Sequence, residues 1–359
     1  MPKSVLPFGP QHPVLPEPLQ LKLVLRDEIV IEALPAIGYV HRGLEKLTEV
    51  KDIHQNIFVV ERICGICSFM HSLCYAMGIE ELMGIEIPER AHYLRVIWGE
   101  IHRIHSHLLW AGCIADAFGF ESLFMLAWQT REKILDLMEM TTGNRVIMSV
   151  NAIGGTRRDI SESHLDQIIS VLKGVRKDVS HLEYVFMNDF TVKYRMGGVG
   201  VLPHDVAYEL GAAGPMLRAS GVSQDMRSLG YAAYDKLDFA PVTADEGDCI
   251  ARTSVRIREI YQSIDLITQA KEQMTEGEYF VPVKGKPPVG EVVTRVEQPR
   301  GECLYYLRSD GTNFLKRVRV RTPTFANVPP LLHMLPGSKL SDVPVLILTI
   351  DPCISCTER

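Results

Sequence analysis

The sequence has no apolar run long enough to cross a bilayer. The longest candidate, VPVLILTI at 343–350, is much shorter than the ~20 apolar residues that a membrane helix needs. We therefore expect no membrane-spanning segment in this chain. The first residues, MPKSVLPFGPQHP, lack the charged and apolar regions of a secretory signal, so we expect a reducing, intracellular setting.

An excess of basic charge is also missing. The chain has 38 Lys and Arg against 44 Asp and Glu, a net charge of −6, and its cations are scattered. This distribution excludes the basic patch that a nucleic-acid partner requires. Internal repeats and low-complexity stretches are absent too. With 359 residues, 46% of them hydrophobic, the chain can form one large core or two closely joined ones.

The periodicity of apolar residues predicts an α+β fold. Two short strands are expected within 19–34, on either side of Arg26-Asp27, and helices are expected through most of 51–277. The expected helical stretches are 48–84, 89–119, 120–140, 161–188, 204–212 and 247–276. Strands are expected at 279–285, 290–311 and 314–325, and the last apolar piece is either strand or helix. We predict a single domain over 1–359: a β-rich part at 1–50, a mainly helical core at 51–277 and a β-rich part at 278–359.

Cysteine is scarce, but its spacing is informative. Four of the 8 cysteines form two C-x-x-C pairs, Cys64 with Cys67 in RICGIC and Cys353 with Cys356 in DPCISC. Two such pairs can present four thiolates to one metal site. A redox disulfide is a weaker explanation, because no thioredoxin-like βαβ pattern surrounds Cys64.

The separation of the two pairs bears on the kind of metal site. Zinc ribbons bring their cysteine pairs together across roughly 15–20 residues. In this chain 285 residues lie between Cys67 and Cys353. A fold that brings its two ends onto one four-sulfur site favours a catalytic metal, although these residues alone leave structural zinc open.

RICGIC and DPCISC resemble the two nickel-ligand motifs in the large subunit of [NiFe] hydrogenases. The resemblance extends over nearly the whole chain and includes GPQHP (9–13), HRGLEK (41–46), RIHSHLLW (103–110), GGTRRD (154–159), GPMLRASG (214–221), YDKLDF (234–239), PRGE (299–302) and YYLRSDG (305–311). These strings are similar to segments shared by two relatives. One is the energy-converting, membrane-associated hydrogenase group of the Ech type (group 4), and the other is the 49 kDa (NuoD-like) quinone-site subunit of respiratory complex I. The complex I subunit lacks the four nickel thiolates, so the cysteines favour the hydrogenase.

The resemblance implies a nickel–iron centre whose iron carries two cyanides and one carbon monoxide, Fe(CN)2(CO). Cys64 and Cys353 would be terminal nickel ligands, while Cys67 and Cys356 would bridge nickel and iron. Soft thiolates suit both metals. Dihydrogen would be split or formed at this centre, with the sulfur of Cys353 as the first proton acceptor.

Three further stretches match positions near the metals in that family. Glu17 corresponds to a glutamate that passes protons, although its local sequence is also that of an ordinary surface acid. Arg300 corresponds to an arginine beside the metals, where a fixed cation polarises bound hydrogen. Pro323 and Thr324 would surround an iron cyanide, with the hydroxyl donating a hydrogen bond.

Other residues of the matching stretches have less defined roles. Glu45 and His41 would lie near the metals or in a proton relay, and His41 is equally suited to a structural role. Asp351 would orient the loop of Cys353, although Asp-Pro also simply favours a turn. The histidines His102, His105 and His107 are expected to be scaffold.

The remaining cysteines, Cys74, Cys113, Cys249 and Cys303, are isolated, which is typical of small buried apolar residues. We therefore expect no iron–sulfur cluster in this chain, and electrons would pass through partner subunits. The resemblance implies a small subunit with a [4Fe-4S] cluster, a ferredoxin-like Fe–S subunit, ferredoxin itself and integral membrane ion-translocating subunits. The chain would be peripheral, on the cytoplasmic side of the membrane. The ending CTER puts a third site for magnesium or iron in doubt.

The sequence thus predicts the catalytic subunit of a multisubunit, energy-converting [NiFe] hydrogenase. Two alternatives remain. One is a quinone-site subunit of a complex I-like NADH or ferredoxin dehydrogenase. The other is a non-catalytic subunit with structural zinc, which metal analysis would distinguish.

Overall fold

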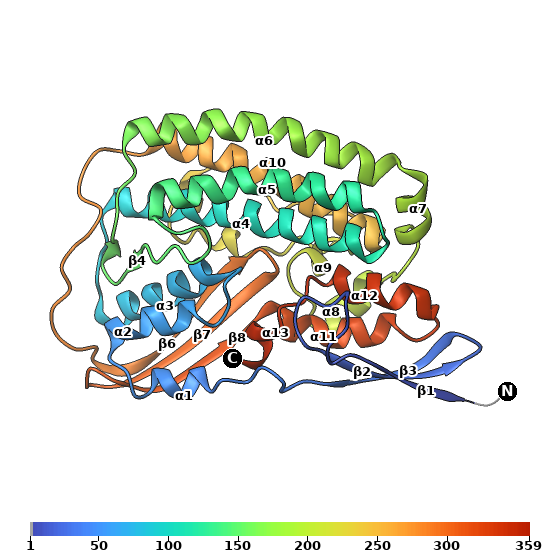
Figure 1. Cartoon of the computed structure of the whole chain (residues 1–359). Helices are drawn as coiled ribbons and strands as arrows, with labels where there is room; N and C mark the ends of the chain where they lie inside the picture. Colours follow the sequence, from blue (N-terminus) through green and yellow to red (C-terminus); the bar gives the residue numbers. More distant parts are fainter. Residues whose placement is uncertain (1–2) are drawn as a thin grey trace.

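Four long helices form the centre of the protein in the computed structural model, which describes residues 3–359 (Figure 1). They are α4 (Glu89–Ala117), α5 (Glu121–Thr142), α6 (Glu162–Asn188) and α10 (Cys249–Gln273). Helix α4 packs against α5 and α10, and α6 covers both from outside. Ser161 caps α6 and Asp248 caps α10 by accepting backbone hydrogen bonds. The predicted boundaries of all four agree with these to within a few residues.

A small antiparallel sheet is formed by the N-terminal part of the chain. Its strands β1 (Ser4–Phe8), β2 (Gln20–Arg26) and β3 (Ile29–Ala36) lie in that order. Asp27 and Glu28 have φ of 50° and 65°, the conformation of a tight two-residue hairpin turn. The strands predicted within 19–34 are confirmed. Strand β1 was not predicted, because most of it is exposed and it shows no apolar alternation.

A second antiparallel sheet contains β6 (Val289–Gln298), β7 (Gly301–Asp310) and β8 (Leu315–Arg321). It packs against α3 (Ser68–Met83). Pro299 and Arg300 form the two-residue turn between β6 and β7. A Cβ on Gly214 would lie 2.3 Å from the Arg300 carbonyl oxygen, so only glycine lets the GPMLRASG loop approach this turn.

The C-terminal part contains fewer strands than the sequence suggested. The strand prediction for 279–285 is wrong, since only an isolated bridge at Phe280 forms there and Pro282 and Gly285 interrupt any ladder. The strand predicted through 325 ends at Arg321, because Pro323 occupies the first turn of a helix. Beyond that residue the chain is helical: α11 (Pro323–Met334), α12 (Val343–Thr349) and α13 (Ile354–Glu358).

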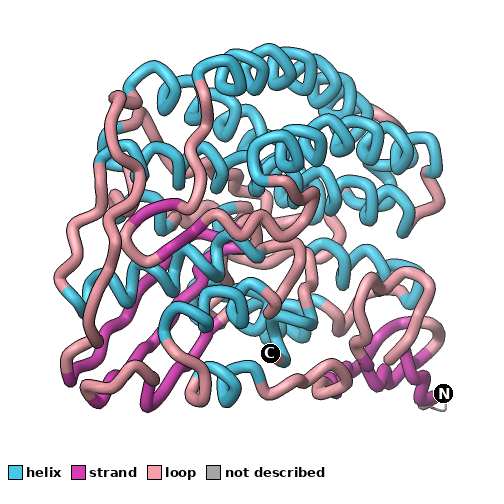
Figure 2. Tube along the Cα trace, turned by 60° about the vertical axis from the view of Figure 1, so that its left-hand side comes forward, coloured by secondary structure: helices cyan, strands magenta, loops and turns pink. Residues whose placement is uncertain are grey.

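Short elements connect these parts. They are α1 (Leu44–Thr48), α2 (Ile53–Glu61), β4 (Asn151–Ala152), β5 (Gly155–Thr156), α7 (Phe190–Met196), α8 (His204–Glu209), α9 (Pro215–Arg218), and three 3-10 turns at Met226–Leu229, Tyr234–Lys236 and Leu340–Asp342. Figure 2 shows the C-terminus within the outline of the molecule, away from the N-terminal strands at its edge. Within residues 3–359, none of the helices has the length and apolar character needed to cross a membrane.

Candidate metal centre

The four paired cysteines meet in one buried cluster, although they come from opposite ends of the chain. Cys64 follows α2, Cys67 precedes α3, and Cys353 and Cys356 belong to the start of α13. Their four sulfur atoms all lie within 4.8 Å of one another. The closest pairs are Cys64 with Cys353 and Cys67 with Cys356, each 3.1 Å apart, beyond the ~2.05 Å of a disulfide. The cluster therefore consists of four free sulfurs.

The electrostatics of this cluster fit a metal site. Hydrogen bonds from the thiols of Cys353, Cys356 and Cys67 lower the pKa of Cys64 well below its ordinary value. Burial raises the pKa of Cys67 to about 11, and burial also raises that of Cys356. Four thiolates at such short distances repel one another, and metal cations are what stabilise them. An all-sulfur donor set suits nickel, iron or zinc.

Arg300 is held beside the cluster by Asp351. Its Nη2 donates to Asp351 Oδ1 at 2.7 Å and its Nε to the Asp351 carbonyl at 2.8 Å, while Nη1 reaches Ser106 Oγ at 3.2 Å. Burial alone would lower the pKa of Arg300, but Asp351 and the cysteine sulfurs raise it, so the side chain remains a cation. Asp351 itself has φ of 54° two residues before Cys353. The pair thus fixes both a buried positive charge and the start of the second cysteine loop.

Glu17 is bound to that second loop. The backbone N–H groups of Ile354 and Ser355 and the Ser355 hydroxyl donate to its carboxylate, the Ser355 N–H at 3.0 Å. Glu17 is half-buried and also lines an open surface pocket with His12. The carboxylate therefore lies between the residue that follows Cys353 and solvent.

Pro323 and Thr324 form the first turn of α11 next to the same loop. The backbone N–H of Cys353 donates to Thr324 Oγ1 at 3.1 Å, which leaves the hydroxyl proton of Thr324 available for another acceptor. The neighbouring Thr322 donates to the carbonyl of Cys356 at 3.2 Å. This turn fixes the backbone of both C-terminal cysteines.

Glu45 and His41 contact the last residues of the chain rather than the sulfurs. Glu45 accepts hydrogen bonds from Arg359 at 2.9 Å, from the Val320 backbone at 3.0 Å and from Arg319 at 2.8 Å. Burial would raise the pKa of Glu45, but these contacts lower it, so it stays ionised. His41 bonds the carbonyl of Glu358. Both residues thereby fasten the segment that carries Cys356, and a relay role remains a prediction.

Arg42 and His71 also contact the cysteine loops, and of the two only His71 was not indicated by the sequence. Arg42 donates to the carbonyls of Arg62 and Ile63, each at 2.7 Å, and of Ser355 at 3.3 Å, and so ties the two cysteine loops together. His71 places Nε2 3.3 Å from the sulfur of Cys356. The available signal for His71 was its spacing, four residues after Cys67 and so on the same helix face.

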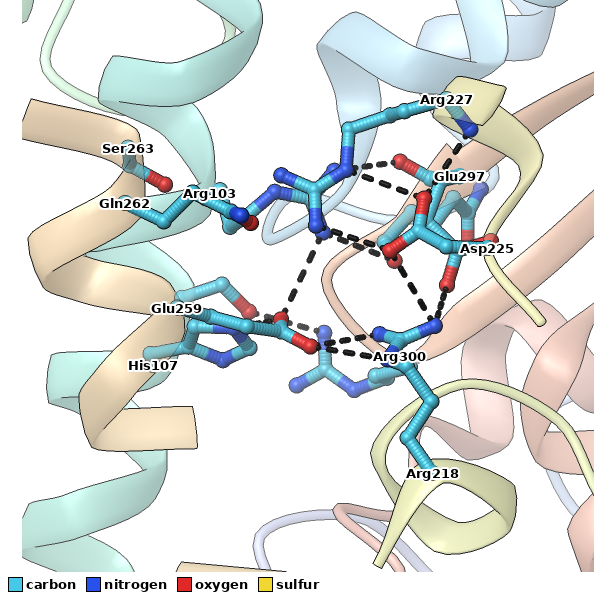
Figure 3. Close-up of polar contacts among 12 residues, drawn as sticks. Arg103, His107, Arg218, Asp225, Arg227, Glu259, Gln262, Ser263, Glu297 and Arg300 are labelled. Atoms are coloured by element: carbon cyan, nitrogen blue, oxygen red, sulfur yellow. Dashed lines mark hydrogen bonds and ion pairs between the residues drawn. The ribbon is translucent and has the colours of Figure 1, made fainter. Parts of the chain in front are cut away.

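A buried charge cluster lies next to the turn that carries Arg300 (Figure 3). It contains three arginines and four carboxylates: Arg103, Arg218, Arg227, Glu100, Asp225, Glu259 and Glu297. Figure 3 shows Arg218 reaching Glu259 on one side and Asp225 and Glu297 on the other; the distances are 2.6, 3.3 and 2.7 Å. His107 contacts the cluster through Glu259 at 2.9 Å.

This buried charge cluster also holds the Arg300 turn. Arg103 donates to the carbonyl oxygens of Glu297 at 2.8 Å and Gln298 at 3.3 Å, immediately before Pro299 and Arg300. The cluster comes from α4, α9, α10, β6 and the 3-10 turn at Met226–Leu229, so several elements must be in place before the turn is fixed. The buried charge cluster therefore holds Arg300 in position.

We expect Arg218→Met to destabilise the fold by roughly 3–5 kcal/mol, because three buried carboxylates would lose their shared cation. The free energy of unfolding in urea measures this directly. Lys133→Met, which removes a surface pair with Asp178, is the control and should have little effect. Equal stabilities of the two variants would contradict the structural role of Arg218.

The buried charge cluster also predicts a pH dependence. Burial and the negative charge of Asp225 raise the pKa of Glu297 to about 7, from about 4.3 for an ordinary glutamate. Between these values the folded chain keeps a proton that the unfolded chain releases, so the free energy of unfolding falls as pH rises. Glu297→Gln should remove this component. Unfolding measured from pH 5 to pH 8 should show wild type losing stability relative to the variant, and a constant difference would contradict the assignment.

Comparisons with known proteins identify the family of this chain. A family profile described as the respiratory-chain NADH dehydrogenase 49 kDa subunit matches residues 117–286 and 280–359. A second profile, described as nickel-dependent hydrogenase, matches residues 42–111, which include the first cysteine pair.

Individual relatives include both hydrogenase subunits and NADH-quinone oxidoreductase subunits. The membrane-bound hydrogenase subunit alpha of Pyrococcus furiosus is 39% identical, over 99% of this chain and 87% of the relative. A subunit of the NADH-quinone oxidoreductase of Dehalococcoides mccartyi is 38% identical, over 99% of this chain and 98% of the relative. A chain of the membrane-bound sulfane sulfur reductase, an archaeal respiratory membrane complex, has a TM-score of 0.95 at 32% identity, with 99% and 98% of the two chains covered.

These matches define the class of protein. The chain belongs to the family of large subunits shared by energy-converting, membrane-associated [NiFe] hydrogenases and the 49 kDa subunit of complex I. Its α+β fold is that of this family.

Proposed function

We propose that this chain is the catalytic subunit of a multisubunit energy-converting [NiFe] hydrogenase. The observation that carries the proposal is the cluster of four buried sulfurs within 4.8 Å, with the Arg300 cation beside it. A nickel–iron centre with Fe(CN)2(CO), when bound there, would supply the reversible heterolysis of dihydrogen. Cys64 and Cys353 are proposed as terminal nickel ligands, and Cys67 and Cys356 as ligands that bridge nickel and iron.

The residues around the sulfurs have chemical roles in this proposal. The sulfur of Cys353 takes up the proton first, and Glu17, bound to the next residue along the chain, carries it to the surface pocket. Arg300 would supply a fixed positive charge beside the bound centre. Thr324 would donate a hydrogen bond from its hydroxyl group to a cyanide ligand, and Pro323 would pack beside it.

The partners follow from the chemistry of the site. Electrons need a path out, so we propose a small subunit with a [4Fe-4S] cluster, a ferredoxin-like Fe–S subunit and ferredoxin as the exchange partner. The names of the relatives place them in membrane complexes. We therefore propose that integral membrane ion-translocating subunits bind this chain at the cytoplasmic side of the membrane.

The second candidate is a quinone-site subunit of a complex I-like dehydrogenase, which the similarity to the NADH-quinone oxidoreductase of Dehalococcoides mccartyi favours. Isotope exchange separates the two functions without any electron acceptor. A purified complex that converts D2 in H2O to HD and H2 has hydrogenase activity. A complex that reduces quinone but performs no exchange would refute the proposal, and so would a complex that contains zinc alone.

A further inference from the structure

Two histidines of α4 are buried without protein hydrogen bonds. The side chains of His102 and His105 are 0% exposed, and none of their four ring nitrogens has a partner among the described residues. Asp351 Oδ2 and Arg131 Nε are buried and equally unpartnered within residues 3–359. This set of six polar atoms is distinct from the buried charge cluster, whose members are ion-paired.

Such an arrangement requires another hydrogen-bonding species. A neutral imidazole always has one N–H donor and one acceptor nitrogen, and leaving a buried polar group unsatisfied costs about 1–3 kcal/mol. Buried water, which typically makes about three hydrogen bonds, satisfies such groups in protein interiors. The six atoms offer both donors and acceptors, and the two imidazole rings are neighbours on one face of α4, with centroids 5.7 Å apart.

Hydrogen bonds connect one member of this set, Asp351, with the arginine beside the metal centre. At the inner end, Asp351 is bonded to Arg300 at 2.7 Å, and Arg300 bonds Ser106, the neighbour of His105. Burial lowers the pKa of His105, and the charges of Arg131 and Arg300 lower it further, so this ring lies within reach of both arginines.

At the outer end lies Cys113, two helical turns beyond His105 and only partly buried. Burial raises its pKa, and the nearby charges of Asp351, Arg300 and Arg131 act on it as well. Arg131 is 8% exposed. We therefore take the partly buried Cys113 on α4 and Arg131 on α5 as the outer end of this set.

We propose that His102 and His105 hold a short chain of water molecules that carries protons between the metal centre and the surface near Cys113 and Arg131, as a second route beside Glu17. In each step an imidazole takes a proton on one ring nitrogen from the water on its inner side. It then releases the proton of its other nitrogen to the water on its outer side, so no net charge remains. The reverse order delivers protons for hydrogen formation. This inference rests on the proposed function of the four cysteines.

The first test is structural and does not depend on turnover. A high-resolution structure of the intact complex should show water within hydrogen-bond distance of both histidine rings, and His105→Phe should displace it. Rings that contact only protein atoms in the wild-type complex would overturn the inference, whether or not the complex contains nickel.

The second test separates proton transfer from hydrogen cleavage. In a complex that also carries Glu17→Gln, so that the water route is the main one left, His105→Phe should slow D2/H2O exchange by a further factor of roughly ten. Conversion of para-hydrogen, which needs cleavage but no proton exit, should persist. His105→Gln, whose amide can bind water but cannot take up a proton, should slow exchange as His105→Phe does. Nickel content and infrared bands of the centre show that each variant is loaded.

The matched control is His92→Phe, which removes a histidine near the other end of α4. In the Glu17→Gln complex, His92→Phe should leave the exchange rate unchanged. Equal exchange with His105→Phe and with His92→Phe in that background would overturn the route. If His105→Phe fails to assemble, His102→Leu is the replacement, with the same expected loss and the same refuting result. Absence of nickel and of the infrared bands in wild type would instead refute the proposed function.

Discussion

Cys353→Ser is expected to lose both nickel and hydrogen cleavage. A serine hydroxyl is a hard, poorly acidic ligand, whereas the site offers four soft sulfurs within 4.8 Å. The loss of activity should exceed about 100-fold, since even groups that only support a metal ligand are worth roughly 10–100-fold. Metal analysis and para-hydrogen conversion on the same purified complex measure both effects.

Cys249→Ser is the matched control for this experiment. Cys249 is fully buried at the start of α10, and its Sγ is 3.7 Å from Nη1 of Arg252. The variant should keep its nickel and its activity. Retention of nickel in Cys353→Ser would contradict the assignment of Cys353 as a metal ligand.

Glu17→Gln is expected to block most proton exchange while leaving hydrogen cleavage intact. Glutamine keeps an oxygen that can accept the hydrogen bonds from Ile354 and Ser355, but it cannot take up a proton. Exchange of D2 with H2O should fall about 100-fold, the lower end of what a proton-transfer group contributes, because the water route through His105 would persist. Para-hydrogen conversion should continue.

The exposed Glu32 of β3 provides the control, and Glu32→Gln should behave as wild type. A parallel loss of exchange and para-hydrogen conversion in Glu17→Gln would show that Glu17 merely holds the Cys353 loop. Unchanged exchange would remove Glu17 from the proton route altogether.

The helical core could be predicted because its signal is local. Each of α4, α5, α6 and α10 is longer than 20 residues, so its apolar period is visible in the sequence, and α6 and α10 also show their capping residues Ser161 and Asp248. For short segments the sequence did not separate strand from helix. Pro323 begins a helix where a strand was predicted, and the buried run at 343–350 has no period that separates strand from helix.

The candidate site could be predicted only in part, for a related reason. The spacing within the two C-x-x-C pairs predicts a metal site. The resemblance to hydrogenases further indicated that Glu17 and Arg300 lie near it. The contacts of Arg218 with Glu259 and Glu297 join residues 41 and 79 positions apart, and no local pattern reports such pairings. Likewise, the sequence of a histidine-rich helix does not show whether the rings have hydrogen-bond partners. That the ring of His102 has none among residues 3–359 is visible only in the three-dimensional structure.

Infrared spectroscopy of the purified complex, combined with metal analysis, tests the central claim most directly. The account predicts sharp cyanide and carbonyl stretching bands, between the absorptions of protein and water, together with one nickel for each chain. A fully assembled, metal-loaded complex that contains zinc and shows no such bands would contradict the nickel–iron centre. The four cysteines would then form a structural zinc site.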